Sequence, residues 1–172
     1  DLIEDLLMYS RTTSNVDSFQ EVDLNEIVEE ITLLHREEFE QKKVVMEVQT
    51  LPTLWGVPFQ FKQLMANLIN NAIKYRHPER QLVITIANEG ISTGSHIKER
   101  ELEADQFYHH ISVRDNGMGF EAQYAEKIFE IFQRLSNHSG TKGSRIGLAI
   151  CKKIVQNHRG FMKATGSVNE GA

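Results

Sequence analysis

The sequence predicts an α+β fold, a two-layer α/β sandwich in which a mixed, mainly antiparallel sheet packs on about three helices. Two observations predict it. Apolar residues recur at helical spacing in several long segments, and short apolar or alternating runs lie between those segments. A length of 172 residues suits one domain of ordinary size, and the chain has no internal repeat.

The elements follow from this patterning. Residues 1–14 carry apolar residues at helical spacing, and we expect them to form the tail of a longer amphipathic helix, joined by a polar connection over 15–23. The connection over 88–106 is expected to be a long exposed hairpin loop, partly helical at 97–104. Further helices are predicted over 23–43, 59–75, 122–132 and 147–158, and strands over 44–48, 53–55, 82–87, 107–113 and 161–164.

Composition excludes some classes of function. The formal net charge of −5 argues against a nucleic-acid-binding protein, which usually carries a basic surface. No apolar run reaches the length of a membrane span, and no signal peptide opens the sequence. The single cysteine, Cys151, lies among apolar residues, which favours packing over chemistry.

The helix predicted over 59–75 carries the most informative pattern. Asn67, Asn71 and Lys74 lie on one stripe, although Asn is a poor helix former. A solvated face would explain one such residue, but two amides one turn apart followed by a cation favour contact with a ligand. An amide oxygen suits Mg²⁺, and a lysine suits phosphate.

Two glycine-bearing segments complete the candidate site. Asp115 leads the turn Asp-Asn-Gly-Met-Gly, where a surface turn is the plain alternative, but a purine could approach the glycine backbone closely. Residues 140–148 are glycine-rich and open a predicted helix, whose N-terminus would attract phosphate. Neither of the two common nucleotide-binding glycine motifs is present.

These segments together resemble a known family. In order, residues 67–75, 115–119, 129–132 and 143–148 look like the asparagine box, first glycine box, phenylalanine box and second glycine box of bacterial sensor histidine kinases. The resemblance covers about residues 20–170 and implies the Bergerat-type ATP-binding fold shared with gyrase, heat-shock-90 chaperones and mismatch-repair ATPases.

The resemblance implies a role for each matching residue, with ATP and Mg²⁺ as ligands. Asn67, Lys74 and Arg134 would act in phosphoryl transfer, Asn71 would ligate Mg²⁺, and Asp115 would accept a hydrogen bond from the adenine amine. Nucleotide contacts are implied for Asn67, Asn71, Lys74, Tyr75, Asp115, Gly117, Gly119, Phe132, Gly143, Gly147 and Leu148. In the gyrase-like branch a Glu stands at the position of Asn67 and acts as a base, which an Asn cannot do.

The resemblance also implies an organisation and partners. Residues 1–15 would end a dimerisation and phosphoacceptor hairpin, and residues 16–172 would form the ATPase domain, with a lid over about 121–146. Partners would be that hairpin, a response regulator and a second copy of the full-length protein, with no nucleic acid and no membrane contact by this segment. We expect a cytoplasmic location, although the parent protein could be membrane-anchored.

The chain departs from the family pattern at three places. Arg145 stands where the middle glycine of the second glycine box is expected, Val57 stands where an acid usually precedes the proline, and the sequence stops before one further expected strand. None of the seven histidines fits the phosphoacceptor pattern of a histidine followed by an acid and a nearby proline. The chain is therefore expected to bind ATP without completing autophosphorylation.

Two alternatives stay open. One is another ATPase or a serine kinase of the same superfamily, and the other is a degenerate regulatory module that binds nucleotide, for which Arg145 is the best support.

Overall fold

The computed structural model describes residues 19–97, 102–130 and 146–172. Its strands are β1 (Gln20–Asp23), β2 (Val45–Val48), β3 (Thr53–Gly56), β4 (Val83–Thr93) and β5 (Phe107–Asp115). Its helices are α2 (Leu24–Leu34), α3 (Arg36–Lys42), α4 (Pro58–Lys74), α5 (Gly94–Ile97) and α6 (Gly147–Asn157), with two 3-10 turns, η1 (Ala122–Tyr124) and η2 (Lys127–Phe129).

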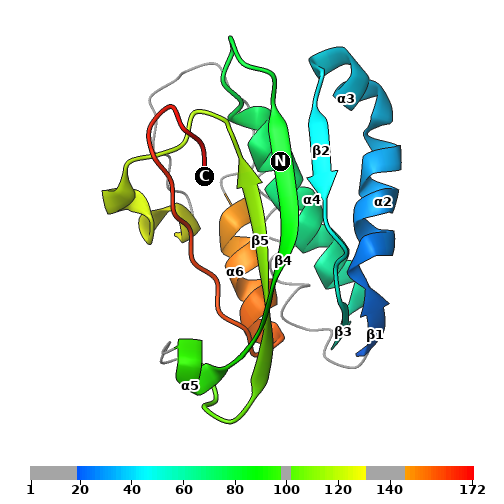
Figure 1. Ribbon diagram of the computed structural model, residues 1–172, viewed down its shortest axis with the longest axis vertical. Coiled ribbons are helices and arrows are strands. Elements are labelled where there is room, and N and C mark those ends of the chain that lie inside the picture. The colour runs from blue at the N-terminus through cyan, green and yellow to red at the C-terminus, as the bar shows by residue number, and fades with distance from the viewer. Residues whose placement is uncertain (1–18, 98–101, 131–145) are drawn as a thin grey trace.

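The main sheet is mixed, as predicted. Its strand order is β2-β4-β5, with β2 parallel to β4 and β4 antiparallel to β5. β1 and β3 form a separate antiparallel pair. In Figure 1, α4 and α6 lie behind β4 and β5, while α2 lies beside the β2 edge.

The core lies between the main sheet and the helices. α4 is central because it contacts both α2 and α6. Ile69 of α4, Ile84 and Ile86 of β4, and Ile154 of α6 are fully buried. Each such side chain contributes roughly 1.5–3 kcal/mol through removal of apolar surface from water. The two-layer α/β arrangement predicted from the patterning is therefore confirmed.

The helix predicted over 23–43 is divided in two. Asp23 caps α2, since its carboxylate accepts a hydrogen bond of 2.8 Å from the backbone N–H of Asn25. His35 leaves helical geometry between α2 and α3, with φ −99° and ψ 11°. Leu34 is the last residue of α2 and is 69% exposed.

The prediction of a long loop over 88–106 is wrong for the first part of that range. β4 continues to Thr93 through a β-bulge at Asn88 and Gly90, and α5 follows at once. Gly90 has φ 114°, a conformation that glycine adopts readily, so polar residues that resemble a loop remain in the strand. Of the helix predicted over 97–104, Ile97 is the last described residue of α5, residues 98–101 lie outside the described residues, and residues 102–104 are not helical.

Three other predicted elements differ. The connection predicted over 15–23 ends in β1, which is stabilised by pairing with β3. The helix predicted over 122–132 is two short 3-10 turns as far as residue 130. The strand predicted over 161–164 does not form, since this segment pairs with no strand of the described residues. The chain reaches β5 only later, where Ala172 and Asp115 exchange two backbone hydrogen bonds.

Several predictions lie outside the described residues. They are the helix over 1–14, Phe132, Arg134, Gly143 and Arg145. Within the described part of the chain, no helix combines the length and apolar character that crossing a bilayer requires.

Candidate functional site

The asparagine-bearing face of α4 meets α6. The side-chain amide of Asn67 donates a hydrogen bond of 3.4 Å to the backbone carbonyl of Gly147. Asn71 and Lys74 lie one and two turns further along α4 and are half-buried. Lys74 places its Nζ 4.7 Å from the ring centroid of Tyr75. The structure therefore brings Asn67 next to the start of α6, and Asn71 and Lys74 follow along α4 toward Tyr75.

The C-terminal end of α4 meets the glycine turn that follows β5. The backbone N–H of Met118 donates a hydrogen bond of 2.9 Å to the carbonyl of Tyr75. Gly117 is packed so closely that a Cβ atom there would lie 2.6 Å from the same carbonyl oxygen. Only a glycine fits this contact without movement of the backbone.

Asp115 is held within the turn. Its Oδ1 accepts a hydrogen bond of 2.8 Å from the backbone N–H of Gly117. Burial raises the pKa of the Asp115 carboxyl, and the Gly117 hydrogen bond opposes that rise by stabilising the carboxylate. Its Oδ2 makes no hydrogen bond with the described residues and is the oxygen left for a ligand.

Gly119 closes the same turn. It has φ 61°, and a Cβ atom there would lie 1.9 Å from the carbonyl oxygen of Ser167. The segment after α6 runs back beside β5 to reach this turn, as Figure 1 shows. The predicted purine turn is thus enclosed by the chain that follows α6.

The N-terminus of α6 lies beside Asn67. Gly147 and Leu148 open this helix, and among the described residues no side chain caps it. The first N–H groups of a helix have no partner within it, and together with the positive end of the dipole they attract anions. This end of α6 can therefore bind a phosphate near Asn67.

The remaining predicted residues divide between described and undescribed segments. Phe129, in the segment that resembles the phenylalanine box, is 7% exposed, and Lys152 places its Nζ 5.8 Å from the centroid of the Phe129 ring. Phe132, Arg134 and Gly143 lie outside the described residues.

Cys151 packs against α4 behind the candidate site and is not a reactive thiol. It is fully buried, its Sγ lies 3.9 Å from the carbonyl oxygen of Leu64, and it also contacts the side chain of Asn67. Burial raises the pKa of its thiol to about 12, so the unreactive thiol predominates at neutral pH. The packing role predicted for this cysteine is confirmed.

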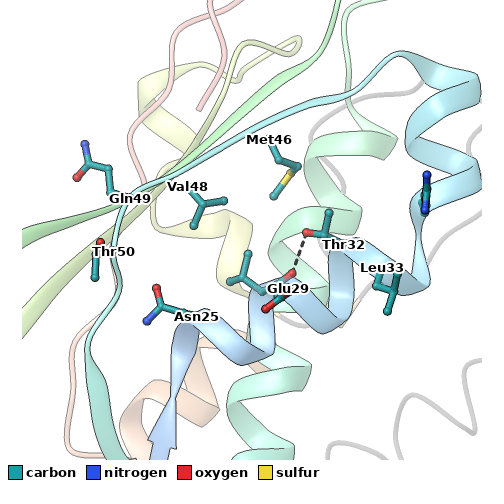
Figure 2. Close-up of a pocket in the computed structure, with 10 residues that line it drawn as sticks. Asn25, Glu29, Thr32, Leu33, Met46, Val48, Gln49 and Thr50 are labelled. Carbon is teal, nitrogen blue, oxygen red and sulfur yellow. Dashed lines mark hydrogen bonds between the residues drawn. The ribbon is translucent and has the colours of Figure 1, made fainter.

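A separate surface cavity lies between α2 and β2. It has a volume of about 640 Å³, and Figure 2 shows Leu33, Met46 and Val48 among its lining side chains. No predicted nucleotide-binding residue is among those that line it. We place the candidate site at α4, since the polar groups suited to a nucleotide converge there.

Sequence reasoning missed the role of two residues, one in the purine turn and one beside it. Asn116, in the turn, hydrogen-bonds to Val83 and Gln81, and Arg80 donates to the carbonyl of Asn116. The only local signal was the Asp-Asn-Gly turn composition around Asn116, and Arg80 carried none because its partners are distant in sequence.

Comparison with known proteins defines the class. Residues 56–172 match the family of histidine kinase-, DNA gyrase B- and HSP90-like ATPases. The match covers more than half of the chain, so the chain belongs to this ATPase family.

Its relatives include two cyanobacterial phytochromes and an adaptive-response sensory kinase. Cyanobacterial phytochrome A of Nostoc sp. is 34% identical over 171 residues, which are 99% of this chain and 20% of that protein. Cyanobacterial phytochrome B of the same organism is 37% identical, over 100% of this chain and 21% of that protein. The adaptive-response sensory kinase SasA of Synechococcus elongatus is 32% identical, over 77% of this chain and 30% of that protein. The chain thus spans about a fifth of the phytochromes it matches.

Solved structures confirm the predicted fold. Full-length ShkA in complex with AMPPNP matches with a TM-score of 0.70 and 21% identity, over 99% of this chain and 33% of that chain. The catalytic domain of histidine kinase ThkA, nucleotide-free, matches with a TM-score of 0.61 and 24% identity, over 81% of each chain. At these identities the likeness concerns the fold. With the family match, it confirms the resemblance to histidine kinase ATP-binding domains.

Proposed function

We propose that this chain binds Mg·ATP and donates the terminal phosphoryl group to a histidine on a helical hairpin of the same parent protein. The observation that carries the proposal is the placement of α4 between two elements that were predicted to bind nucleotide. Asn67 contacts the N-terminus of α6, and the carbonyl of Tyr75 contacts the glycine turn that carries Asp115. Asn67 and Tyr75 are eight residues apart in sequence, which corresponds to roughly 12 Å along the helix.

Each of the two elements that contact α4 suits one part of the nucleotide. At the turn, Asp115 accepts a hydrogen bond from the adenine amine while Gly117 lets the base approach the backbone. At the α6 end, the N–H groups of Gly147 and Leu148 bind phosphate oxygens, and Lys74 supplies a positive charge between the two ends.

The residues on α4 also fit Mg²⁺. Asn71 offers an amide oxygen one turn from Asn67, on the side of α4 that faces the phosphate end. Amide oxygens are hard ligands of the kind Mg²⁺ accepts beside waters and phosphate oxygens. When bound, the ion neutralises charge on the phosphates.

The transfer itself needs positioning rather than covalent help from the protein. The acceptor imidazole nitrogen forms a bond to the terminal phosphorus, the bond from that phosphorus to the bridging oxygen breaks, ADP leaves, and the imidazole loses a proton. Lys74 stabilises charge on the phosphates, and we assign Arg134 the same role at the terminal phosphate. Asn67 cannot deprotonate a water, which favours transfer to histidine over hydrolysis.

The proposal also assigns a role to each segment of the chain and names the partners of the parent protein. Residues 1–15 would end the phosphoacceptor hairpin, residues 16–172 would form the ATPase domain, and residues 121–146 would form its lid, with contacts from Phe132 and Gly143. The acceptor histidine lies on the part of the hairpin outside this sequence. A response regulator would take the phosphoryl group from it, since ThkA has been solved in complex with the response regulator protein TrrA. The full-length protein would be a homodimer. This segment would lie in the cytoplasm, whether or not the parent protein is anchored in a membrane.

A second candidate is a regulatory module that binds nucleotide without phosphoryl transfer. Arg145 in place of a glycine favours it, because the second glycine box would then be altered at its middle position. Both candidates require ATP binding, and only the first requires transfer.

Calorimetric titration with Mg·ATP tests the binding, and transfer of radiolabel from ATP to the hairpin of the parent protein tests the reaction. We expect binding and transfer by the unsubstituted chain. Asp115→Ala should weaken ATP binding about a hundredfold, the size of a lost hydrogen bond to a charged group, with the far-UV spectrum unchanged. Asp105→Ala, at an exposed acid in the turn before β5, is the matched control and should bind normally.

Absence of binding at millimolar Mg·ATP would contradict both candidates. Binding without transfer would favour the regulatory module. Normal binding by Asp115→Ala would show that the purine assignment is wrong.

A further inference from the structure

We propose that Asn116 is a positioning residue that sets the Asp115 carboxylate for recognition of adenine, and that Arg80 assists it. The proposal rests on the proposed function and deepens it. Neither residue is given a ligand contact, since both act through the backbone of the turn.

Asn116 fastens the turn to the start of β4 with three hydrogen bonds. Its side-chain Oδ1 accepts from the backbone N–H of Val83 at 2.9 Å, and its Nδ2 donates to the carbonyl of Gln81 at 2.9 Å. Its backbone N–H donates to the carbonyl of Val83 at 3.3 Å. Both polar ends of the side chain are therefore used, which fixes its orientation.

Arg80 fastens the turn from outside. Its Nη1 donates to the carbonyl of Asn116 at 3.2 Å, and its Nη2 donates to the carbonyl of Asn169 at 2.7 Å. The backbone N–H of Asn169 in turn donates to the carbonyl of Met118 at 2.7 Å. One guanidinium thus joins the turn to the segment that encloses it.

These contacts define the position of Asp115, the residue before Asn116. Its Oδ1 is held by the N–H of Gly117, on the other side of Asn116, so any movement of Asn116 moves both ends of that hydrogen bond. The direction of Oδ2 then depends on the turn conformation. A hydrogen bond weakens steeply with poor alignment, so loosening the turn should reduce recognition of the base amine before it reduces phosphate binding.

The experiment compares two nucleotides that differ at the recognised group. ATP carries an amine on the base, and inosine triphosphate carries an oxygen there. In Asn116→Ala we expect ATP affinity to fall about tenfold, the size of one lost hydrogen bond, with inosine triphosphate affinity nearly unchanged. The ratio of the two affinities, measured by calorimetry with Mg²⁺ present, should therefore fall about tenfold.

Asn88→Ala is the matched control. The side chain of Asn88 also accepts a backbone N–H, that of Gly90 at 3.2 Å, but at the bulge of β4 away from the turn. We expect the control to lose stability in the same way while its nucleotide ratio stays that of the unsubstituted chain. If a general loss of stability caused the effect, the ratio of the two affinities would change alike in both variants. A positioning role would change the ratio only in Asn116→Ala.

A further variant covers the case in which Asn116→Ala does not fold. Arg80 is exposed, so Arg80→Ala should fold and should lower the ratio in the same direction by about threefold, about half of the free energy of one hydrogen bond. An unchanged ratio in the foldable variants, with ATP binding intact, would overturn this inference alone. Failure of the unsubstituted chain to bind ATP would instead overturn the proposed function and this inference with it.

Discussion

The turn after β5 and the N-terminus of α6 both contact α4, and each carries a glycine for a different reason. At the purine end, Gly117 is packed against the carbonyl of Tyr75, where a Cβ atom would lie 2.6 Å from the oxygen. At the phosphate end, Gly147 has space, since a Cβ atom there would lie 3.9 Å from the side chain of Asn67. The first glycine is required by the protein's own packing. Beside the second, the described residues leave room, which suits a ligand.

Gly117→Ala should have the largest effect of the changes that test this difference. The added methyl group would clash with backbone on α4, so we expect a loss of about 1–3 kcal/mol in the free energy of unfolding. ATP affinity should also fall, because the turn must move away from Tyr75. Chemical denaturation and calorimetric titration would measure the two effects, and unchanged stability would show that the packing argument is wrong.

A third contact, which we call the His158 junction, lies at the C-terminal end of α6. Its effect on the free energy of unfolding should be intermediate in size and should depend on pH. His158 donates from Nδ1 to the carbonyl of Ile154 at 2.7 Å and accepts at Nε2 from the N–H of Val57 at 3.0 Å, while it packs on Phe61. This arrangement requires the neutral ring. Burial lowers the pKa of His158, and its hydrogen bond to Ile154 opposes that effect.

Stability from this junction should therefore be complete above the unfolded-state pKa of about 6.5 and be lost as the pH falls through the lower folded-state value. We expect a loss of about 1 kcal/mol, the size of one hydrogen bond. Urea denaturation between pH 7 and pH 5 would measure it. His158→Gln cannot titrate and should reduce the pH dependence; an equal dependence in the variant would assign it to other groups.

Gly147→Ala should have the smallest effect on stability. The position is the first residue of α6, where alanine is at least as favourable as glycine, so we expect a change within about 0.5 kcal/mol. Thermal unfolding without nucleotide would measure it. A fall in ATP affinity at unchanged stability would sharpen the comparison by showing that the space serves the ligand, whereas a large loss of stability would show that both glycines are structural.

Sequence patterning predicted the helices that form the site better than the strands that carry it. The apolar residues of α4 recur with a strong helical period, and the helix observed over Pro58–Lys74 differs from the prediction by one residue at each end. The extension of β4 was missed because pairing with β5 stabilises residues whose own composition is that of a loop.

The site shows the same division. Asp115, Gly117 and Gly147 could be predicted because their chemistry is local to a short motif. Arg80 could not, since its bond to the carbonyl of Asn169 joins segments that only the fold brings together. Contacts with backbone carbonyls leave little trace in residue type at the accepting position.

The β4–β5 hairpin also makes the molecule easy to label. Its far end, at α5, lies roughly 27 Å from Asp115, since the nine residues of β5 separate them at about 3.4 Å per step. Ser95 is exposed there, and the one native cysteine is buried, with its thiol pKa raised to about 12. Ser95→Cys would therefore give a single reactive thiol for a fluorescent dye, placed where the dye cannot obstruct nucleotide entry.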